Sequence, residues 1–185
     1  MKYAADTIAE LARQSLKLAK ERLSGVPVHC GREPRIPGLH GWVFEQTVQF
    51  CLLEELAVRG IIPEVEEQSK LCGKAKADLR VGHVLVEIKT RGLFGISDVE
   101  RYRKYKQWAQ AKGYRYLFLT ASETYMPYRR GICDAVGEDS VFLLDQPDHW
   151  ERFVETIVNE LASRASGRPP GVDRTRGRSR RLSWE

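Results

Sequence analysis

Residues 77–89 of the chain read Ala-Asp-Leu-Arg-Val-Gly-His-Val-Leu-Val-Glu-Ile-Lys. Two runs rich in apolar residues flank Gly82-His83, and a two-residue turn with glycine first is typical of a β-hairpin with a type II′ turn. Such a turn fixes the register of the two strands, so that Asp78 faces Glu87. The segment therefore predicts an antiparallel strand pair.

Side-chain alternation divides this hairpin into two faces. One face is apolar and is expected to be core: Leu79, Val81, Val84, Val86 and Ile88. The other face carries Asp78, Arg80, Leu85, Glu87 and Lys89. Two carboxylates directly opposite each other, with β-carbons roughly 4.5–5.5 Å apart, destabilise a sheet unless something neutralises them. A divalent cation would do so, because Mg²⁺ takes carboxylate oxygens; the alternative is a solvated face on which Arg80 and Lys89 screen the acids.

The flanking sequence predicts helices around a small sheet. Apolar periodicity indicates helices over residues 3–24, about 41–58, about 98–112 (capped by Ser97 or Asp98) and 147–163. Beside the hairpin strands 77–81 and 84–90, strands are expected over 61–68, 114–120 and 140–145, whereas residues 121–139 look irregular. This order of elements implies an α/β fold with a mixed five-stranded sheet flanked by helices.

Length and charge indicate one domain followed by a basic tail. A chain of 185 residues suits a single core, here residues 1–163. The tail, residues 164–185, has seven arginines against two acidic residues and so accounts for the whole net charge of +5. Such a tail fits the salt-dependent grip of nucleic-acid binders on phosphate; a solubilising tail fits the charge equally well.

Hydropathy and cysteine spacing exclude other classes. No apolar run is long enough to cross a bilayer and the first residues lack a secretory signal, so we expect a cytoplasmic protein without membrane contact. The cysteines at 30, 51, 72 and 133 lack the C-x-x-C spacing of a zinc site. Cys51 is expected in the core, and a metal site using His29 and Cys30 stays open as an alternative.

The order of the acidic residues and the lysine resembles a known enzyme superfamily. Asp78, followed across two strands by Glu87-Ile88-Lys89 and then by a helix and a strand, resembles the PD-(D/E)xK nucleases, which include Holliday-junction resolvases and type II restriction enzymes. The stretch Gly41-x3-Glu45 resembles the opening of the helix before the sheet in that family. Ala77 departs from the proline of the family's name but leaves the carboxylate in place. The resemblance implies a restriction-endonuclease-like core over about residues 41–145.

The resemblance also implies an activity. It points to a Mg²⁺-dependent deoxyribonuclease, with Mn²⁺ as a substitute, that hydrolyses DNA phosphodiester bonds as an endonuclease and acts as a homodimer. Its catalytic set would be Glu45, Asp78, Glu87 and Lys89, with the three carboxylates as metal ligands. Lys89 would hold or deprotonate the attacking water, or neutralise charge in the transition state. The alternatives are a non-catalytic nucleic-acid-binding module and a nuclease subunit of a larger DNA-processing complex.

Basic residues near the hairpin and in the tail are candidates for DNA contacts. They are Arg91, Arg101, Lys104, Arg129, Arg130, Arg178, Arg180 and Arg181. The helix that carries Arg101 and Lys104 interleaves cations with Tyr102, Tyr105 and Trp108, a pattern that suits a phosphate backbone. Alternatively, the aromatic residues belong to the core and the cations are merely solvated.

Overall fold

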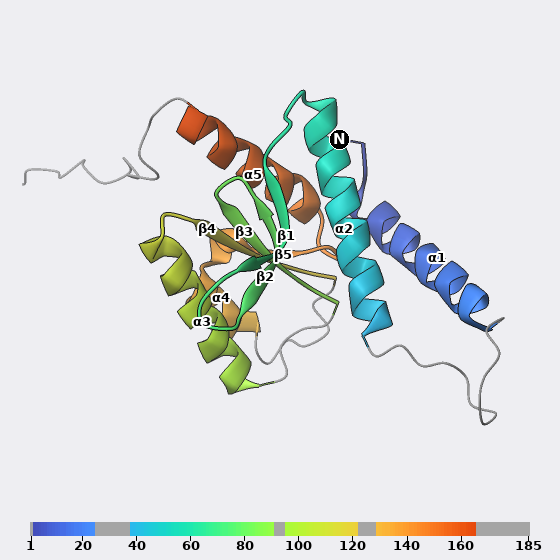
Figure 1. Cartoon of the computed structure of the whole chain (residues 1–185), viewed down its shortest axis with the longest axis horizontal. Helices are drawn as coiled ribbons and strands as arrows, with labels where there is room; N and C mark the ends of the chain where they lie inside the picture. The colour runs from blue at the N-terminus through green and yellow to red at the C-terminus, as the bar shows by residue number, and fades with distance from the viewer. Residues whose placement is uncertain (1, 25–37, 91–94, 122–128, 166–185) are drawn as a thin grey trace, which may run out of the picture.

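The computed structural model describes residues 2–24, 38–90, 95–121 and 129–165 (Figure 1). Two helices, α1 (Ala5–Ser24) and α2 (Leu39–Val58), precede the strands β1 (Val65–Lys70), β2 (Lys76–Val81) and β3 (Val84–Lys89). Helix α3 (Ile96–Ala111) and strand β4 (Arg115–Thr120) follow, then α4 (Arg129–Val136) and a 3₁₀ turn (Glu138–Ser140). The last elements are β5 (Val141–Leu143) and α5 (His149–Ala165).

The five strands form one mixed sheet in the order β1-β2-β3-β4-β5. Strands β1, β2 and β3 are antiparallel neighbours, whereas β4 lies parallel to β3 and β5 lies parallel to β4. The direction of pairing therefore changes at β3. The expected α/β class with a mixed five-stranded sheet is confirmed.

The hairpin between β2 and β3 has the expected register. Leu79 pairs with Val86, and Val81 with Val84 on either side of the turn. Gly82 has a φ of 59°, as the first position of a type II′ turn requires, and glycine adopts this conformation without steric cost. The turn thus sets which side chains of both strands reach each face of the sheet.

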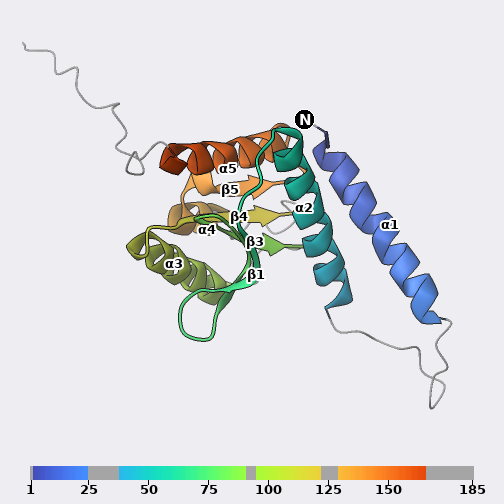
Figure 2. The same cartoon turned by 45° about the horizontal axis from the view of Figure 1, so that its top comes forward.

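Helices cover both faces of the sheet (Figure 2). The apolar face of the hairpin, including Leu79, Val86 and Ile88, packs with α2 and α5 into one buried cluster, to which α1 adds Ile8 and Ala12 from outside α2. The opposite face packs with α3 and α4 into a second cluster, around Tyr116, Phe118 and other residues. Cys51 lies in the first cluster, as expected.

The region expected to be irregular contains a helix, so that prediction was wrong for residues 129–136. This helix is short and buries three apolar side chains, Ile132, Ala135 and Val136. It packs on α3 at Gly131, where a Cβ would lie 3.2 Å from Val99. Its stability comes from that tertiary contact, which a local pattern does not reveal.

Several boundaries also differ from the expectation. Strand β1 begins at Val65 rather than at residue 61, because the Ile61 N–H still donates to the Leu56 carbonyl at the end of α2. Helix α3 begins at Ile96 behind Gly95 with no side-chain cap, so the expected Ser97 or Asp98 cap was wrong. Strand β5 has only three residues. None of the helices in the described ranges has the length and apolar character that a membrane crossing needs.

Candidate active site

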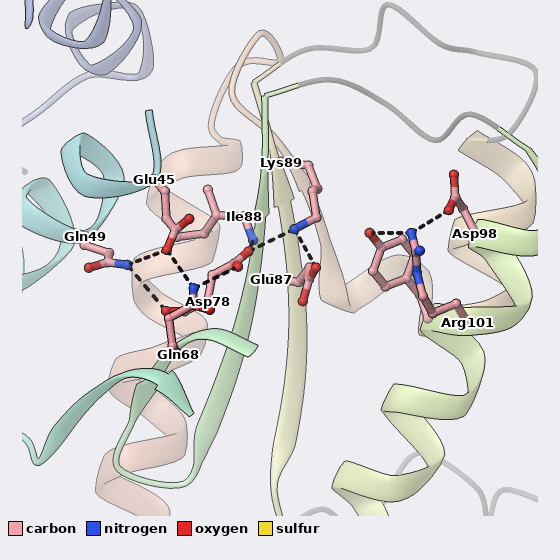
Figure 3. A network of polar contacts seen from close by, with 10 residues as sticks. Glu45, Gln49, Gln68, Asp78, Glu87, Ile88, Lys89, Asp98 and Arg101 are labelled. Atoms are coloured by element: carbon pink, nitrogen blue, oxygen red, sulfur yellow. Dashed lines mark hydrogen bonds and ion pairs between the residues drawn. The ribbon is translucent and has the colours of Figure 1, made fainter. Parts of the chain in front are cut away.

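A continuous chain of polar contacts links three carboxylates at one end of the hairpin (Figure 3). Gln68 on β1 donates through Nε2 to Glu45 Oε1 of α2 at 3.2 Å and to Asp78 Oδ1 of β2 at 3.5 Å. The Lys89 ammonium on β3 lies 3.1 Å from Asp78 Oδ2 and 2.6 Å from Glu87 Oε1. All four residues expected from the sequence are therefore brought together, with Gln68 as an addition.

Asp78 departs from the expected strand geometry. Its carboxylate Oδ2 accepts a hydrogen bond of 2.7 Å from the buried backbone N–H of Ile88, and Asp78 and Glu87 do not form a ladder pair. Leu79 packs in the cluster beneath α2, whereas Ala77 packs in the opposite cluster, so the alternation of faces is interrupted at Asp78. The expected direct opposition of Asp78 and Glu87 was wrong; Lys89 joins them instead.

Gln68 and Gln49 complete the surroundings of Glu45. Gln49, one turn beyond Glu45 on α2, donates to Glu45 Oε1 at 3.3 Å and to the backbone carbonyl of Asp78 at 3.5 Å. Gln68 has a φ of 51°, which is rare for a residue other than glycine. Both glutamines were missed in the sequence. Gln49 could have been found from its i, i+4 spacing to Glu45, whereas no local pattern distinguishes Gln68 in the exposed strand β1.

Burial leaves two of the carboxylates poorly neutralised. Glu87 is 5% exposed, and its Oε2 has no hydrogen-bond partner. Burial raises the pKa of Glu87, against the opposing effect of Lys89. Burial, with Asp78 beside it, raises the pKa of Glu45 to about 7. The site thus holds acidic groups whose charge costs free energy in the absence of a cation.

Lys89 is the positive charge in the middle of this chain. Burial lowers the pKa of its ammonium, but the attraction of Glu87 and Asp78 outweighs burial, so the pKa is raised above its ordinary value. Lys89 is therefore charged at neutral pH, and it neutralises about one of the acidic groups around it.

Helix α3 contributes a guanidinium on the side of Glu87. Arg101 is held by Asp98 at 2.5 Å and stacks over the Tyr102 ring at 5.1 Å. Tyr102 is buried, and burial, with Glu87 nearby, raises its pKa to about 12. The side chain of Arg101 is half exposed, so it combines a fixed position with access to solvent.

The other candidates for DNA contact are less well placed by the structure. Lys104 and Arg130 are exposed, on α3 and α4. Arg129 begins α4, and its side chain lies outside the described residues. Arg91, Arg178, Arg180 and Arg181 lie outside them too, as do His29 and Cys30.

No three His, Cys, Asp or Glu side chains within the described ranges converge as a ready-made metal-ion site. In this contact chain a nitrogen donor stands between each successive pair of carboxylates. The unpartnered Glu87 Oε2 and the three carboxylates of Glu45, Asp78 and Glu87 nevertheless suit a divalent cation of the Mg²⁺ class.

Comparisons with protein-family profiles, curated proteins and solved structures found no match to this chain.

Proposed function

We propose that the protein is a metal-dependent deoxyribonuclease of the PD-(D/E)xK superfamily, with a restriction-endonuclease-like core, that cleaves DNA as an endonuclease. The observation that carries this proposal is the contact chain from Glu45 through Asp78 and Lys89 to Glu87. Three acids and one lysine in that order suit phosphodiester hydrolysis, in which negative charge builds up on a phosphate.

Asp78 and Glu87 would hold the cation, with Glu45 as the third carboxylate. Mg²⁺ fits these oxygen donors, and Mn²⁺ is expected to substitute. The chemistry that a divalent cation supplies here is neutralisation of charge on the phosphate and easier ionisation of the attacking water. The buried Glu87 oxygen without a partner supports this assignment, since it is an acceptor in need of a positive group.

Lys89 acts in this proposal as an ammonium rather than as a base. This role follows from its position, because Nζ lies 3.1 Å from Asp78 Oδ2 and 2.6 Å from Glu87 Oε1, and both carboxylates favour the charged form in the metal-free protein. Its three N–H donors orient a water or a phosphate oxygen and offset the charge of the transition state.

Arg101 would position the DNA backbone. A guanidinium presents a planar fork of donors that matches phosphate oxygens, and Asp98 and Tyr102 restrict the rotation of this one. Lys104 lies further along the same helix and is exposed, so it would add a second cation of α3 to the DNA contact.

The direct test is cleavage of supercoiled plasmid, linear duplex, four-way junction and single-stranded DNA with Mg²⁺ or Mn²⁺. We expect nicked or linear products from the closed circle, and loss of cleavage in chelator and in the Asp78→Asn and Glu87→Gln variants. Glu100→Gln is the matched control, because it removes an exposed carboxylate of α3 away from the contact chain.

Cleavage that survives in both Asp78→Asn and Glu87→Gln would contradict the site. Binding of DNA without cleavage under any of these conditions would instead favour a non-catalytic binding module. Light scattering of the same preparation tests the homodimer.

A further inference from the structure

Gln68 links Glu45 to Asp78, whereas Lys89 links Asp78 to Glu87. Its Nε2 reaches Glu45 Oε1 and Asp78 Oδ1, while Lys89 Nζ reaches Asp78 Oδ2 and Glu87 Oε1. Each nitrogen donor therefore lies within reach of two carboxylates, which is the kind of position that a cation favours. The two donors differ in one respect, since Lys89 carries a charge and Gln68 is neutral.

We propose that Gln68 is a ligand of the cation: its amide group holds Glu45 and Asp78 through Nε2 in the metal-free protein and turns to present Oε1 when a divalent cation binds at this set of carboxylates. This inference rests on the proposed metal-dependent function and adds a neutral residue to its ligand set. A carboxamide has a donor end and an acceptor end on one planar group. Rotation about the last side-chain bond exchanges the two ends without moving the backbone.

The reason for the exchange is electrostatic. Two carboxylates alone attract the NH₂ end of the amide and repel its oxygen. A divalent cation among the same carboxylates reverses both preferences, and amide carbonyl oxygens are ordinary ligands of hard cations. At the other end of the same contact chain, the Oε2 of buried Glu87 has no hydrogen-bond partner, which independently supports a cation at this set of carboxylates.

Gln49 makes similar contacts but lacks this freedom. Its Nε2 donates to Glu45 and to the Asp78 backbone, while its Oε1 accepts from Gln46 at 3.4 Å, and Gln49 is 4% exposed. Both ends of its amide are therefore engaged in a buried setting. Gln68 is exposed on the edge strand β1, so its amide has room to turn.

The backbone of β1 also favours a specific role for Gln68. Its φ of 51° lies in the left-handed region, which is unfavourable for a residue with a Cβ. The pairs on either side, Glu67 with Leu79 and Ser69 with Ala77, remain in register, so the distortion is confined to the position opposite Asp78. Strain of this kind is retained at binding sites more often than elsewhere.

The test measures Mn²⁺ binding to the full-length chain by titration calorimetry, without DNA. Gln68→Ala removes the ligand and should raise the dissociation constant about tenfold, whereas Gln68→Glu supplies a charged oxygen and should lower it about tenfold. Asp78→Asn serves as the reference that removes the negative charge of a central ligand. Gln110→Ala, an exposed glutamine at the far end of α3, is the matched control and should bind like the wild type.

Thermal unfolding in chelator and in Mn²⁺ gives a second readout. The Gln68→Glu protein should melt below the wild type in chelator, because three carboxylates then face one another, and Mn²⁺ should raise its melting temperature more than that of the wild type. A purely structural role would lower stability in both conditions alike. Because the glutamate keeps the length of the side chain, this variant remains informative if Gln68→Ala fails to fold.

The outcomes separate this inference from the proposed function. If Gln68→Ala binds Mn²⁺ within twofold of the wild type while Asp78→Asn has lost binding, the cation site stands and the role of Gln68 is overturned. Weaker binding in Gln68→Glu would overturn it as well. If the wild type binds no Mn²⁺, or binds it no better than Asp78→Asn, the proposed function fails at this site, and the inference fails with it.

Discussion

Asp78 is expected to support both the fold and the chemistry, and two substitutions separate these roles. Its Oδ2 is the acceptor for the buried Ile88 N–H and contacts the Lys89 ammonium. Alanine leaves that N–H without a partner, at a cost of about 1–3 kcal/mol. Lys89 retains Glu87 at 2.6 Å, and removal of one negative charge relieves repulsion on Glu45, so we expect a net loss of about 2 kcal/mol for Asp78→Ala.

Asparagine keeps an oxygen in the position of Oδ2. It can still accept from Ile88 and Lys89, so Asp78→Asn should cost at most about 1 kcal/mol. For a chain of this length, 1 kcal/mol shifts the melting temperature by about 2–4 °C. Urea unfolding in chelator, with plasmid cleavage measured on the same samples, distinguishes the two variants.

Both variants should lack cleavage, since each removes the carboxylate charge. An Asp78→Ala protein as stable as the wild type would refute the role of Asp78 as the acceptor for Ile88. Substantial cleavage by Asp78→Asn would refute its role as a charged ligand, whatever the stability result.

Three further predictions concern the turn, the pH dependence and the buried ion pair. Gly82→Ala should cost about 2–3 kcal/mol in urea unfolding, because φ is 59° and the new Cβ would lie 2.7 Å from Leu161 Cδ2; a Leu161→Ala background that recovers none of the loss would argue against the clash. In chelator, the contribution of Glu45 to stability is fully present below its ordinary pKa of 4.5 and is lost as the pH rises through about 7. Glu45→Gln should remove this loss, which is about 1 kcal/mol in the free energy of unfolding between pH 5 and 8 after allowance for solvent screening. A variant whose stability depends on pH as the wild type does would contradict this role of Glu45. Lys89→Met should cost about 2–3 kcal/mol by stranding Glu87, and adding Glu87→Gln should restore most of that; simple additivity in the double-mutant cycle would exclude the coupling.

The sequence predicted those features whose causes are local. The glycine of the turn fixes the hairpin register, and the apolar periodicity over residues 41–58 predicts α2, whose buried face includes Cys51 as expected. The proximity of Glu45, Asp78, Glu87 and Lys89 followed from the register and from the resemblance together. Their roles in metal binding and catalysis remain predictions.

The remaining features depend on contacts that no local pattern encodes. An aspartate side chain that captures the Ile88 N–H competes with regular pairing, so the ideal strand geometry overstated the opposition of Asp78 and Glu87. Gln68 reaches the site because its own backbone adopts a left-handed conformation, and the composition of β1 does not predict this. Helix α4 packs against Val99 of α3, and the eight residues of α4 alone do not predict this contact.

The order of the strands has a consequence for how the protein folds. Strands β1, β2 and β3 follow one another along the chain with only residues 71–75 and 82–83 between them, so their pairing closes short loops at little entropic cost. The strands β4 and β5 join by longer crossovers, and pairings of that kind form more slowly. Asp78, Glu87 and Lys89 all belong to the strands joined by short loops, so we expect folding to meet the repulsion between these two acids before the sheet is complete. If these acids bind a divalent cation as proposed, the cation should speed folding as well as slow unfolding.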